Sequence, residues 1–232
     1  MTVDRPDLLA YTRGHLMTSG REWWGLATAE RKERERTQRR ESILRAAARL
    51  FAERPYEAVR VDDIALAAEL AKGTVYLYFS DKDAIVAALG LRLLEGMRRE
   101  MDAVTAAVRG GQVSATTGLL RVMEVWHQAY WSAPGLFRVL VLDRPHLLEA
   151  VTCGGDGRPG RMLESLEAII NAGRDTGQLP TSIDPGVVSH AVWALFVGGV
   201  LLAGRGEISE RDLRNNSLPV LSALVRGLCM ES

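Results

Sequence analysis

Helical periodicity is the feature that most constrains this chain. Along most of its 232 residues, apolar side chains recur at intervals of three and four, and no segment alternates apolar and polar residues as a half-buried strand would. The predicted helices cover residues 37–53, 61–68, 72–79, 83–108, 114–131, 134–144, 161–176, 185–204 and 209–228. We therefore predict an all-α protein.

Cysteine content and the distribution of apolar residues indicate the cellular compartment of the protein. Cys153 and Cys229 are the only cysteines, which excludes a disulfide scaffold, and they lack the paired spacing of a zinc site. Charges interrupt the first residues, unlike those of a secretory signal. The longest apolar run, Ala191–Ala203, is too short to span a bilayer and is typical of a buried helix. We expect a cytoplasmic protein that does not contact a membrane.

Residue types that support catalysis do not cluster in this sequence. The histidines are scattered, and there is neither an HExxH motif nor a glycine-rich phosphate loop. We interpret His127 and His190 as packing histidines rather than as ligands. Cys153 has no neighbour that would activate a thiol. The sequence predicts no catalytic residue, no metal and no cofactor, with an α-helical enzyme kept as an alternative from another class.

The charge of the chain is unevenly distributed although its net value is zero. Between Arg31 and Arg60 there are ten Lys and Arg residues against five Asp and Glu residues. Such an excess fits a surface that faces nucleic acid, but it also fits a helix face that is simply solvated. Charge alone leaves both interpretations open.

The spacing of two short helices is more specific. A helix over residues 61–68 is followed, after about three residues, by one over residues 72–79, which is helix-turn-helix spacing. Ser80 and Asp83 have the spacing of a capping box at the start of the next long helix. The sequence thus predicts a small DNA-binding unit, in which the second short helix is the recognition helix.

Four motifs in this region carry a family resemblance. ILRAAARLFAE, VDDIALAA, AKGTVYLYF and SDKDAIV occur in this order and together resemble the DNA-binding domain of the tetracycline-repressor (TetR) family. The resemblance implies a helix-turn-helix DNA-binding domain over residues 37–83 and a helical ligand-binding and dimerisation domain over residues 84–232. Residues 1–36 are then an amino-terminal extension, which we expect to be flexible.

The resemblance also implies which side chains meet DNA. It assigns Tyr76 and Lys82 to phosphates, and Lys72 and Thr74 to base edges or phosphates, whereas Val75 and Phe79 pack inward. The full set of predicted DNA-binding residues is Thr37, Arg39, Arg40, Lys72, Gly73, Thr74, Tyr76, Leu77, Tyr78 and Lys82. The first three would grip phosphates or reach the minor groove, or else be merely solvated.

Three positions depart from the family pattern, one of them Arg60, which stands where a serine or threonine usually caps the second helix. Ala71 stands where a serine usually caps the recognition helix, and losing such a cap typically costs about 1 kcal/mol. Glu69 occupies the turn position that is often glycine, and its charge opposes that of nearby phosphates. These changes affect fine contacts rather than the motif.

The resemblance implies a regulator of transcription, a repressor that a small molecule releases from palindromic double-stranded DNA. An activator and a non-specific DNA binder remain alternatives. The predicted effector site combines aromatic and methionine side chains: Met123, Trp126, Tyr130, Trp131, Phe137, Trp193 and Phe196. These residues suit an apolar or aromatic effector of unknown identity, but a plain hydrophobic core would look the same.

A homodimer is the expected assembly. Helices over residues 185–203 and 209–228 are predicted to pair with those of a second copy as a four-helix bundle. The argument rests on apolar side chains that one copy alone would leave uncovered: Val188, Val192, Leu195, Val200, Leu221, Leu224 and Val225.

Overall fold

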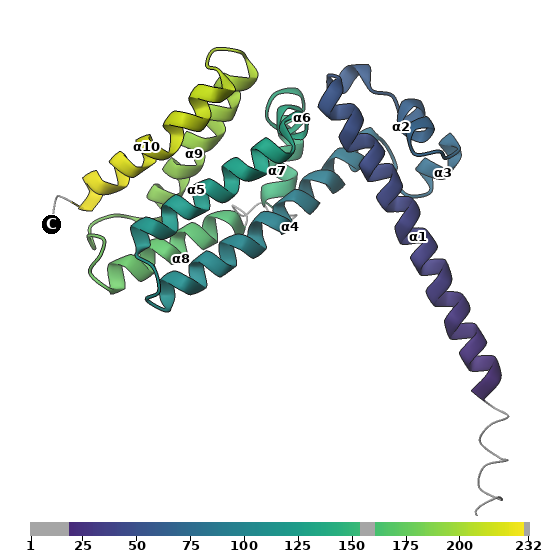
Figure 1. Ribbon diagram of the computed structural model, residues 1–232, viewed down its shortest axis with the longest axis horizontal. Helices are drawn as coiled ribbons and strands as arrows, with labels where there is room; N and C mark the ends of the chain where they lie inside the picture. Colours follow the sequence, from purple (N-terminus) through teal and green to yellow (C-terminus); the bar gives the residue numbers. More distant parts are fainter. Residues whose placement is uncertain (1–18, 154–160, 230–232) are drawn as a thin grey trace, which may run out of the picture. The chain divides into compact units, whose positions relative to one another are not determined.

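The computed structural model describes residues 19–153 and 161–229, and every regular element in these ranges is helical (Figure 1). The elements are α1 Ser19–Glu53, η1 Tyr56–Ala58, α2 Val61–Ala67, α3 Lys72–Tyr76, α4 Lys82–Arg109, α5 Ala115–Ser132, α6 Pro134–Arg138, η2 Val139–Asp143, α7 Pro145–Cys153, α8 Arg161–Asp175, α9 Pro185–Gly204 and α10 Glu210–Cys229. The predicted all-α class is confirmed. The chain divides into two compact units, residues 1–43 and 44–232.

The first unit contains the amino-terminal part of α1, and this helix begins earlier than predicted. It starts at Ser19 rather than at Thr37, so the described part of the extension is helical, while its flexibility stays a prediction. Strong helix formers dominate the segment that follows Ala27. Arg31 pairs with Glu35 at 3.6 Å and Arg36 with Glu33 at 3.9 Å, which are the spacings that stabilise a helix surface. Residues 1–18 lie outside the described residues.

Within the second unit, residues 44–86 form a small helical domain that we term the head. Its core side chains are at most 8% exposed: Leu44, Ala47, Leu50, Phe51, Tyr56, Val59, Ile64, Ala65, Ala68, Val75, Phe79, Ile85 and Val86. The rings of Phe51 and Tyr56 stack with centroids 6.0 Å apart. This core fixes α2 and α3 in contact with one another, so the helix-turn-helix arrangement is confirmed.

The turn between α2 and α3 has a strained residue. Glu69 has φ of 59°, a left-handed conformation that costs a non-glycine residue about 1–2 kcal/mol. We expect Glu69→Gly to raise the free energy of unfolding by about 1 kcal/mol, because glycine adopts this conformation without strain. Chemical denaturation followed by circular dichroism measures the change.

A matched control for this prediction is Glu100→Gly, in the exposed interior of α4. There glycine replaces a good helix former and should lower stability by about 1 kcal/mol. Equal losses in the two variants would contradict the strain at Glu69.

Residues 87–153 and 161–229, which we term the body, pack as a helical bundle. Figure 1 shows α4, α5 and α8 side by side, with α9 against α8 and α10 against α5. Trp126, Met123, Leu166 and Ile169 are fully buried between these helices. A Cβ atom at Gly118 would lie 2.5 Å from Val108, so glycine permits α4 and α5 to approach closely.

The predicted cap of α4 is wrong by one residue. Asp81, not Ser80, is the N-cap, and its carboxylate accepts a hydrogen bond from the Ala84 N–H at 2.7 Å. The Ser80 hydroxyl donates to Asp81 instead, at 3.0 Å. An aspartate serves equally well at an N-cap, and its charge suits the helix dipole. Asp83 is therefore available for other contacts.

The predicted helix over residues 134–144 is also only partly right. Its first turn, α6, is an α-helix that begins with Pro134, but η2 widens to π-helical geometry over Val139–Asp143. A further helix, α7, follows Arg144, where the sequence pattern gave no clear signal. Wide turns of this kind occur mostly where a local function requires them.

The apolar helix α9 is buried on one side only. Val192, Phe196 and Val200 are at most 5% exposed, whereas Val187 is 68% exposed and Leu202 37%. By length and composition alone α9 could cross a membrane, and 22% of its apolar window is buried. A single helix of this kind is weak evidence for a membrane span, since core helices of soluble proteins have the same composition.

The burial of three residues corrects the predicted dimer interface. Val192, Val200 and Leu221 face the core of their own chain and cannot form an outer surface. The exposed stripe of α9 consists instead of Val187, Ala191, Ala194, Gly198 (half-buried) and Leu202, and that of α10 includes Val220, Ala223 and Leu224. Of Val225 only the helical backbone is described.

Candidate functional site

The recognition helix α3 and Leu77, the residue that follows it, expose four of the ten predicted DNA-binding residues to solvent. Tyr76 is 47% exposed and Leu77 81%, while Val75 is buried at 1%. Lys72 and Gly73 are exposed as well, and a Cβ atom at Gly73 would meet no atom within 4 Å. Thr74 and Tyr78 are half-buried. Val75 and Phe79 point inward as predicted, and the outward set has the polar and aromatic character that a major-groove helix needs.

Lys72, at the first position of α3, is held by the preceding helix. Its ammonium lies 2.9 Å from one oxygen of Asp62 and donates to the other at 3.0 Å. This hydrogen bond raises the pKa of Lys72, with the charge of Asp62 acting in the same direction. Ala71 provides no side-chain cap, so the Lys72–Asp62 pair is the polar tie between α2 and the start of α3. A base or phosphate that binds Lys72 must compete with Asp62.

Lys82 has a structural role that the sequence did not predict. Its ammonium donates to the carbonyl oxygens of Tyr56, at 2.7 Å, and Val59, at 2.8 Å, and it lies 3.8 Å from the centre of the Tyr56 ring. Partial burial lowers the pKa of Lys82. Since an ammonium has three protons, two of them are used inside the head. Phosphate binding by Lys82 stays a prediction that depends on the third.

Thr37, Arg39 and Arg40 lie on the amino-terminal part of α1, and all three are exposed. Exposure is compatible both with a DNA contact and with simple solvation. Their role stays a prediction.

A polar cluster that sequence reasoning missed connects the head to the body. We term Tyr56, Glu57, Asp83, Arg144 and His146 the Asp83 cluster. The Tyr56 hydroxyl donates to Asp83, and the Arg144 guanidinium lies 3.6 Å from the same carboxylate and 4.4 Å from the centre of the Tyr56 ring. Glu57 lies 3.8 Å from Arg144, and His146 lies 3.9 Å from Asp83.

The Asp83 cluster perturbs Tyr56 strongly. Burial of the phenol, together with its hydrogen bond to Asp83, raises the pKa of Tyr56 to about 12. The hydroxyl therefore keeps its proton, and its hydrogen bond to Asp83, at every physiological pH. Arg144 directly follows the π-helical turn η2 of the body, and from this position its guanidinium contacts the head. No spacing rule links residues so distant in sequence.

A second contact between head and body is steric. A Cβ atom at Gly135 of α6 would lie 2.2 Å from the carbonyl oxygen of Phe51 and 2.7 Å from the Cα atom of Ala52. The backbone of α6 thus rests directly on the last turns of α1. Only glycine allows so close an approach between two backbones.

The predicted effector-site residues all belong to one hydrophobic cluster of the body. Met123, Trp126, Tyr130, Phe137 and Phe196 are buried, and Trp131 and Trp193 are partly buried. The ring centroids form a continuous series: Trp193–Trp126 5.3 Å, Trp126–Phe196 5.4 Å, Phe196–Phe137 6.0 Å, Phe137–Tyr130 5.6 Å and Tyr130–Trp131 4.5 Å. We term these seven residues the aromatic cluster. Binding of an effector there stays a prediction, because tight packing alone is also the mark of a core.

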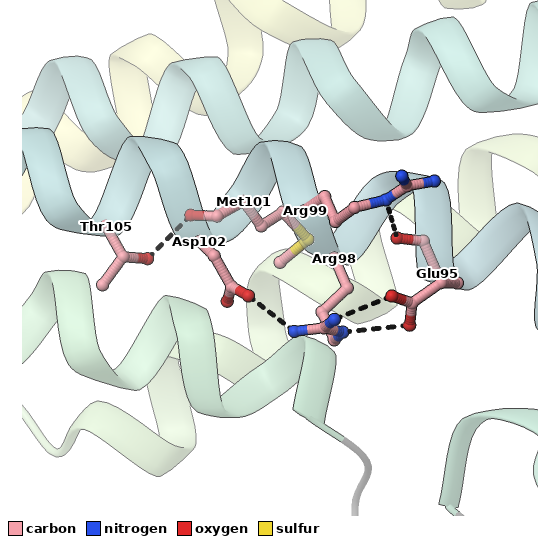
Figure 2. Close-up of polar contacts among 6 residues, drawn as sticks. All are labelled: Glu95, Arg98, Arg99, Met101, Asp102 and Thr105. Atoms are coloured by element: carbon pink, nitrogen blue, oxygen red, sulfur yellow. Dashed lines mark hydrogen bonds and ion pairs between the residues drawn. The ribbon is translucent and has the colours of Figure 1, made fainter. Parts of the chain in front are cut away.

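A hydrogen bond connects the aromatic cluster to the long helix α4. The Trp126 indole N–H donates to the sulfur of Met101 at 3.2 Å, and both side chains are fully buried. On the same helix, Arg98 binds both oxygens of Glu95 and one of Asp102, and the Thr105 hydroxyl donates to the Met101 carbonyl oxygen at 2.9 Å (Figure 2). These contacts within α4 stiffen the helix whose first turn carries Lys82 and Asp83.

Within residues 19–153 and 161–229, no group of three or more His, Cys, Asp or Glu side chains could hold a metal ion. The titratable groups with shifted pKa values lie in the head, on α4, at His127 and at Arg144.

Comparison with known proteins agrees with this geometry. Residues 43–89 match the family model described as bacterial regulatory proteins, tetR family. The chain is 25% identical over 175 residues to the A-factor receptor protein of Streptomyces griseus, an alignment that covers 75% of this chain. The same alignment covers 57% of that receptor, so the chain spans less than two thirds of its length.

Solved structures show the same fold. FadR from Bacillus subtilis in complex with stearoyl-CoA matches with a TM-score of 0.65 and 24% identity, over 81% of this chain and 98% of FadR. SmeT, the repressor of the Stenotrophomonas maltophilia multidrug efflux pump SmeDEF, matches with a TM-score of 0.62 and 21% identity, over 80% of this chain and 89% of SmeT. At these identities the likeness extends to the fold alone.

Proposed function

We propose that this chain, whose residues 43–89 match the model of the tetR family of bacterial regulatory proteins, is a member of that family, that it binds operator DNA and regulates transcription, and that it has no enzymatic activity. The observation that carries the proposal is the surface of α3 and its C-cap residue Leu77. Lys72, Gly73, Tyr76 and Leu77 are exposed there, while Val75 is buried. A helix with this pattern enters the major groove with its outward side chains toward the base edges. The regulator would act in the cytoplasm.

The proposed assembly is a homodimer through α9 and α10. The exposed stripe of α9 combines apolar and small residues, and Gly198 has no atom within 4 Å of a Cβ position. Small residues let helices of two copies approach closely, and the exposed Val220 and Leu224 of α10 extend the apolar surface. A two-fold dimer presents two recognition helices, so its operator is expected to be near-palindromic, with half-sites about 34–36 Å apart.

The proposed signal is a small apolar or aromatic molecule that binds at the aromatic cluster. Trp126 contacts Met101 of α4, and Phe137 of α6 precedes η2, which ends at Arg144. Movement in the aromatic cluster would therefore reach the head along two routes, α4 and the Asp83 cluster. One similar protein, FadR from Bacillus subtilis, has been solved in complex with stearoyl-CoA, of which the acyl chain, but not the phosphorylated CoA part, is apolar.

Footprinting on genomic fragments, with and without candidate effectors, tests the function. We expect protection of a near-palindrome that the effector abolishes. Loss of protection on adding effector identifies a repressor; protection that requires effector identifies an activator. Uniform coverage of all fragments would exclude a specific regulator and support a non-specific DNA binder.

The Lys72–Asp62 pair gives a residue-level prediction for that operator. Lys72→Ala should weaken binding about tenfold or more and relax sequence preference, because it removes a base contact. Asp62→Asn should strengthen operator binding severalfold, because Lys72 then no longer has to break an ion pair with Asp62 before it binds DNA. Fluorescence anisotropy with labelled operator measures both affinities.

The double variant and a distant arginine provide the controls. Asp62→Asn in the Lys72→Ala background should have little effect, since its benefit acts through Lys72. Arg109→Ala, at the far end of α4, should bind as the parent does. If Asp62→Asn strengthens binding equally in both backgrounds, Asp62 repels DNA directly and Lys72 has no base contact.

A further inference from the structure

His127 is a buried histidine with one ring nitrogen in use. It lies on α5, is 6% exposed, and its Nδ1 atom is 2.7 Å from the carbonyl oxygen of Met123. Because a carbonyl oxygen can only accept, Nδ1 must carry the proton of this hydrogen bond. In a neutral imidazole the other nitrogen, Nε2, then has a free lone pair.

Among the described residues, no group binds this lone pair. Nε2 is buried and has no hydrogen-bond partner, a condition that is rare for polar atoms in protein interiors. Burial lowers the pKa of His127, so the ring is neutral near pH 7 and Nε2 is an acceptor. The ring meets Phe196 edge-on, with centroids 5.6 Å apart, so His127 also touches the aromatic cluster.

His127 lines a groove between α5 and α10 with a volume of about 580 Å³. The wall that α10 contributes is Leu218, and Trp131 of the aromatic cluster forms part of the wall from α5. Polar side chains of α5 complete the lining: Glu124, Gln128 and Ser132. Beside Leu218, the Ser217 hydroxyl oxygen is likewise buried without a partner. The groove thus combines apolar side chains with a histidine whose Nε2 atom has no partner.

We propose that this groove is an effector subsite in which His127 Nε2 accepts a hydrogen bond from a hydroxyl or N–H group of an uncharged small molecule. The apolar part of that molecule lies against Trp131 and Leu218. The inference rests on the proposed function, in that it names the chemical class of the effector. It adds a requirement for a hydrogen-bond donor to the apolar character that the aromatic cluster alone suggests.

The same chemistry disfavours carboxylates at the subsite as long as His127 is neutral. The lone pairs of a carboxylate would repel the lone pair of Nε2, and its negative charge would repel Glu124. A neutral alcohol instead donates a hydrogen bond to Nε2. An alcohol and its methyl ether differ at this one proton. Since the ether is the more apolar of the two, burial alone would favour the ether.

Isothermal titration of the full-length protein, without DNA, with 1-decanol, decyl methyl ether and decanoate provides the test. We expect 1-decanol to bind about fivefold to tenfold more tightly than the ether, as one net hydrogen bond allows, and decanoate to bind least. In His127→Phe the advantage of the alcohol should disappear while the affinity for the ether stays the same.

His190→Phe is the matched control. His190 makes the same bond to a carbonyl four residues earlier, from Nδ1 to Gly186 at 2.7 Å, but it is exposed on α9. This variant should retain the preference for the alcohol. Equal affinities of alcohol and ether in the parent, a preference that survives in His127→Phe, or no binding of any probe would overturn the proposal. None of these results would affect specific DNA binding, so the two proposals fail separately.

A measurement on the parent protein avoids any folding defect of the variant. With ¹⁵N-labelled histidine, the Nε2 resonance of His127 should begin at the position of an unprotonated nitrogen and move toward lower frequency on addition of 1-decanol, as for a lone pair that accepts a hydrogen bond. The ether should leave it in place. An Nε2 resonance that already has the hydrogen-bonded position, and that 1-decanol does not move, would show that the lone pair is satisfied within the protein.

Discussion

Gly135→Ala should disrupt the junction between head and body. The new methyl group would lie 2.2 Å from the Phe51 carbonyl oxygen, and since both partners are backbone, neither can rotate away. We expect a loss of about 3 kcal/mol in the free energy of unfolding, at the upper end of the range for overpacked sites. Operator affinity should fall further than stability alone explains, because the head must move on the body to make room.

Gly96→Ala is the matched control for this substitution. Gly96 lies within α4, and a Cβ atom there would meet nothing within 4 Å. Alanine should stabilise this helix by up to about 1 kcal/mol through its higher propensity. Urea denaturation and operator titration of both variants provide the comparison. Equal stability of Gly135→Ala and the parent would show that α6 does not rest on α1 in solution.

Gly198→Arg should abolish the dimer. A long charged side chain at this position would point out of the apolar stripe of α9, where the second copy is proposed to pack. The folded chain should remain intact, since no neighbour lies near the Cβ position. Sedimentation velocity is expected to show a monomer at concentrations where the parent is a dimer.

Loss of the dimer should have a large effect on DNA binding. Two linked heads gain an avidity of about 10²–10⁴ over one head, so a palindromic operator should bind Gly198→Arg at least about 100-fold more weakly. Gly96→Arg places the same side chain on α4. This variant should remain a dimer in sedimentation and should bind the operator with unchanged affinity. A dimeric Gly198→Arg with parental affinity would locate the interface elsewhere.

Hydrophobic periodicity and capping residues predicted most of the helices but not all of their boundaries. Ser114 and Asp184 cap α5 and α9 as their types suggest, accepting hydrogen bonds from Thr117 and Val187. At α4, two adjacent residues could both cap, and the choice of Asp81 leaves Asp83 to bind Tyr56 and Arg144. That outcome depends on partners distant in sequence, which periodicity does not reveal.

The candidate sites divide in the same way. The outward pattern of α3 follows from burial of Val75 and Phe79, which the family resemblance had implied from the sequence. The hydrogen bonds of Lys82 to two carbonyl oxygens form only where α4 meets η1, and the pair of Lys72 with Asp62 forms only where α3 meets α2. The lone pair of His127 is likewise invisible in the sequence, because its isolation depends on which neighbours fail to reach it.

The perpendicular rings of Trp126 and Trp193 have an optical consequence. Their centroids are 5.3 Å apart at an interplanar angle of 87°, and transition dipoles that are close and not parallel couple as excitons. The pair should therefore give a circular dichroism couplet in the ultraviolet that disappears in Trp193→Phe. Because its sign and amplitude follow the mutual orientation of the two indoles, the couplet is an intrinsic gauge of the body's interior, and it needs no attached dye to report how that interior rearranges.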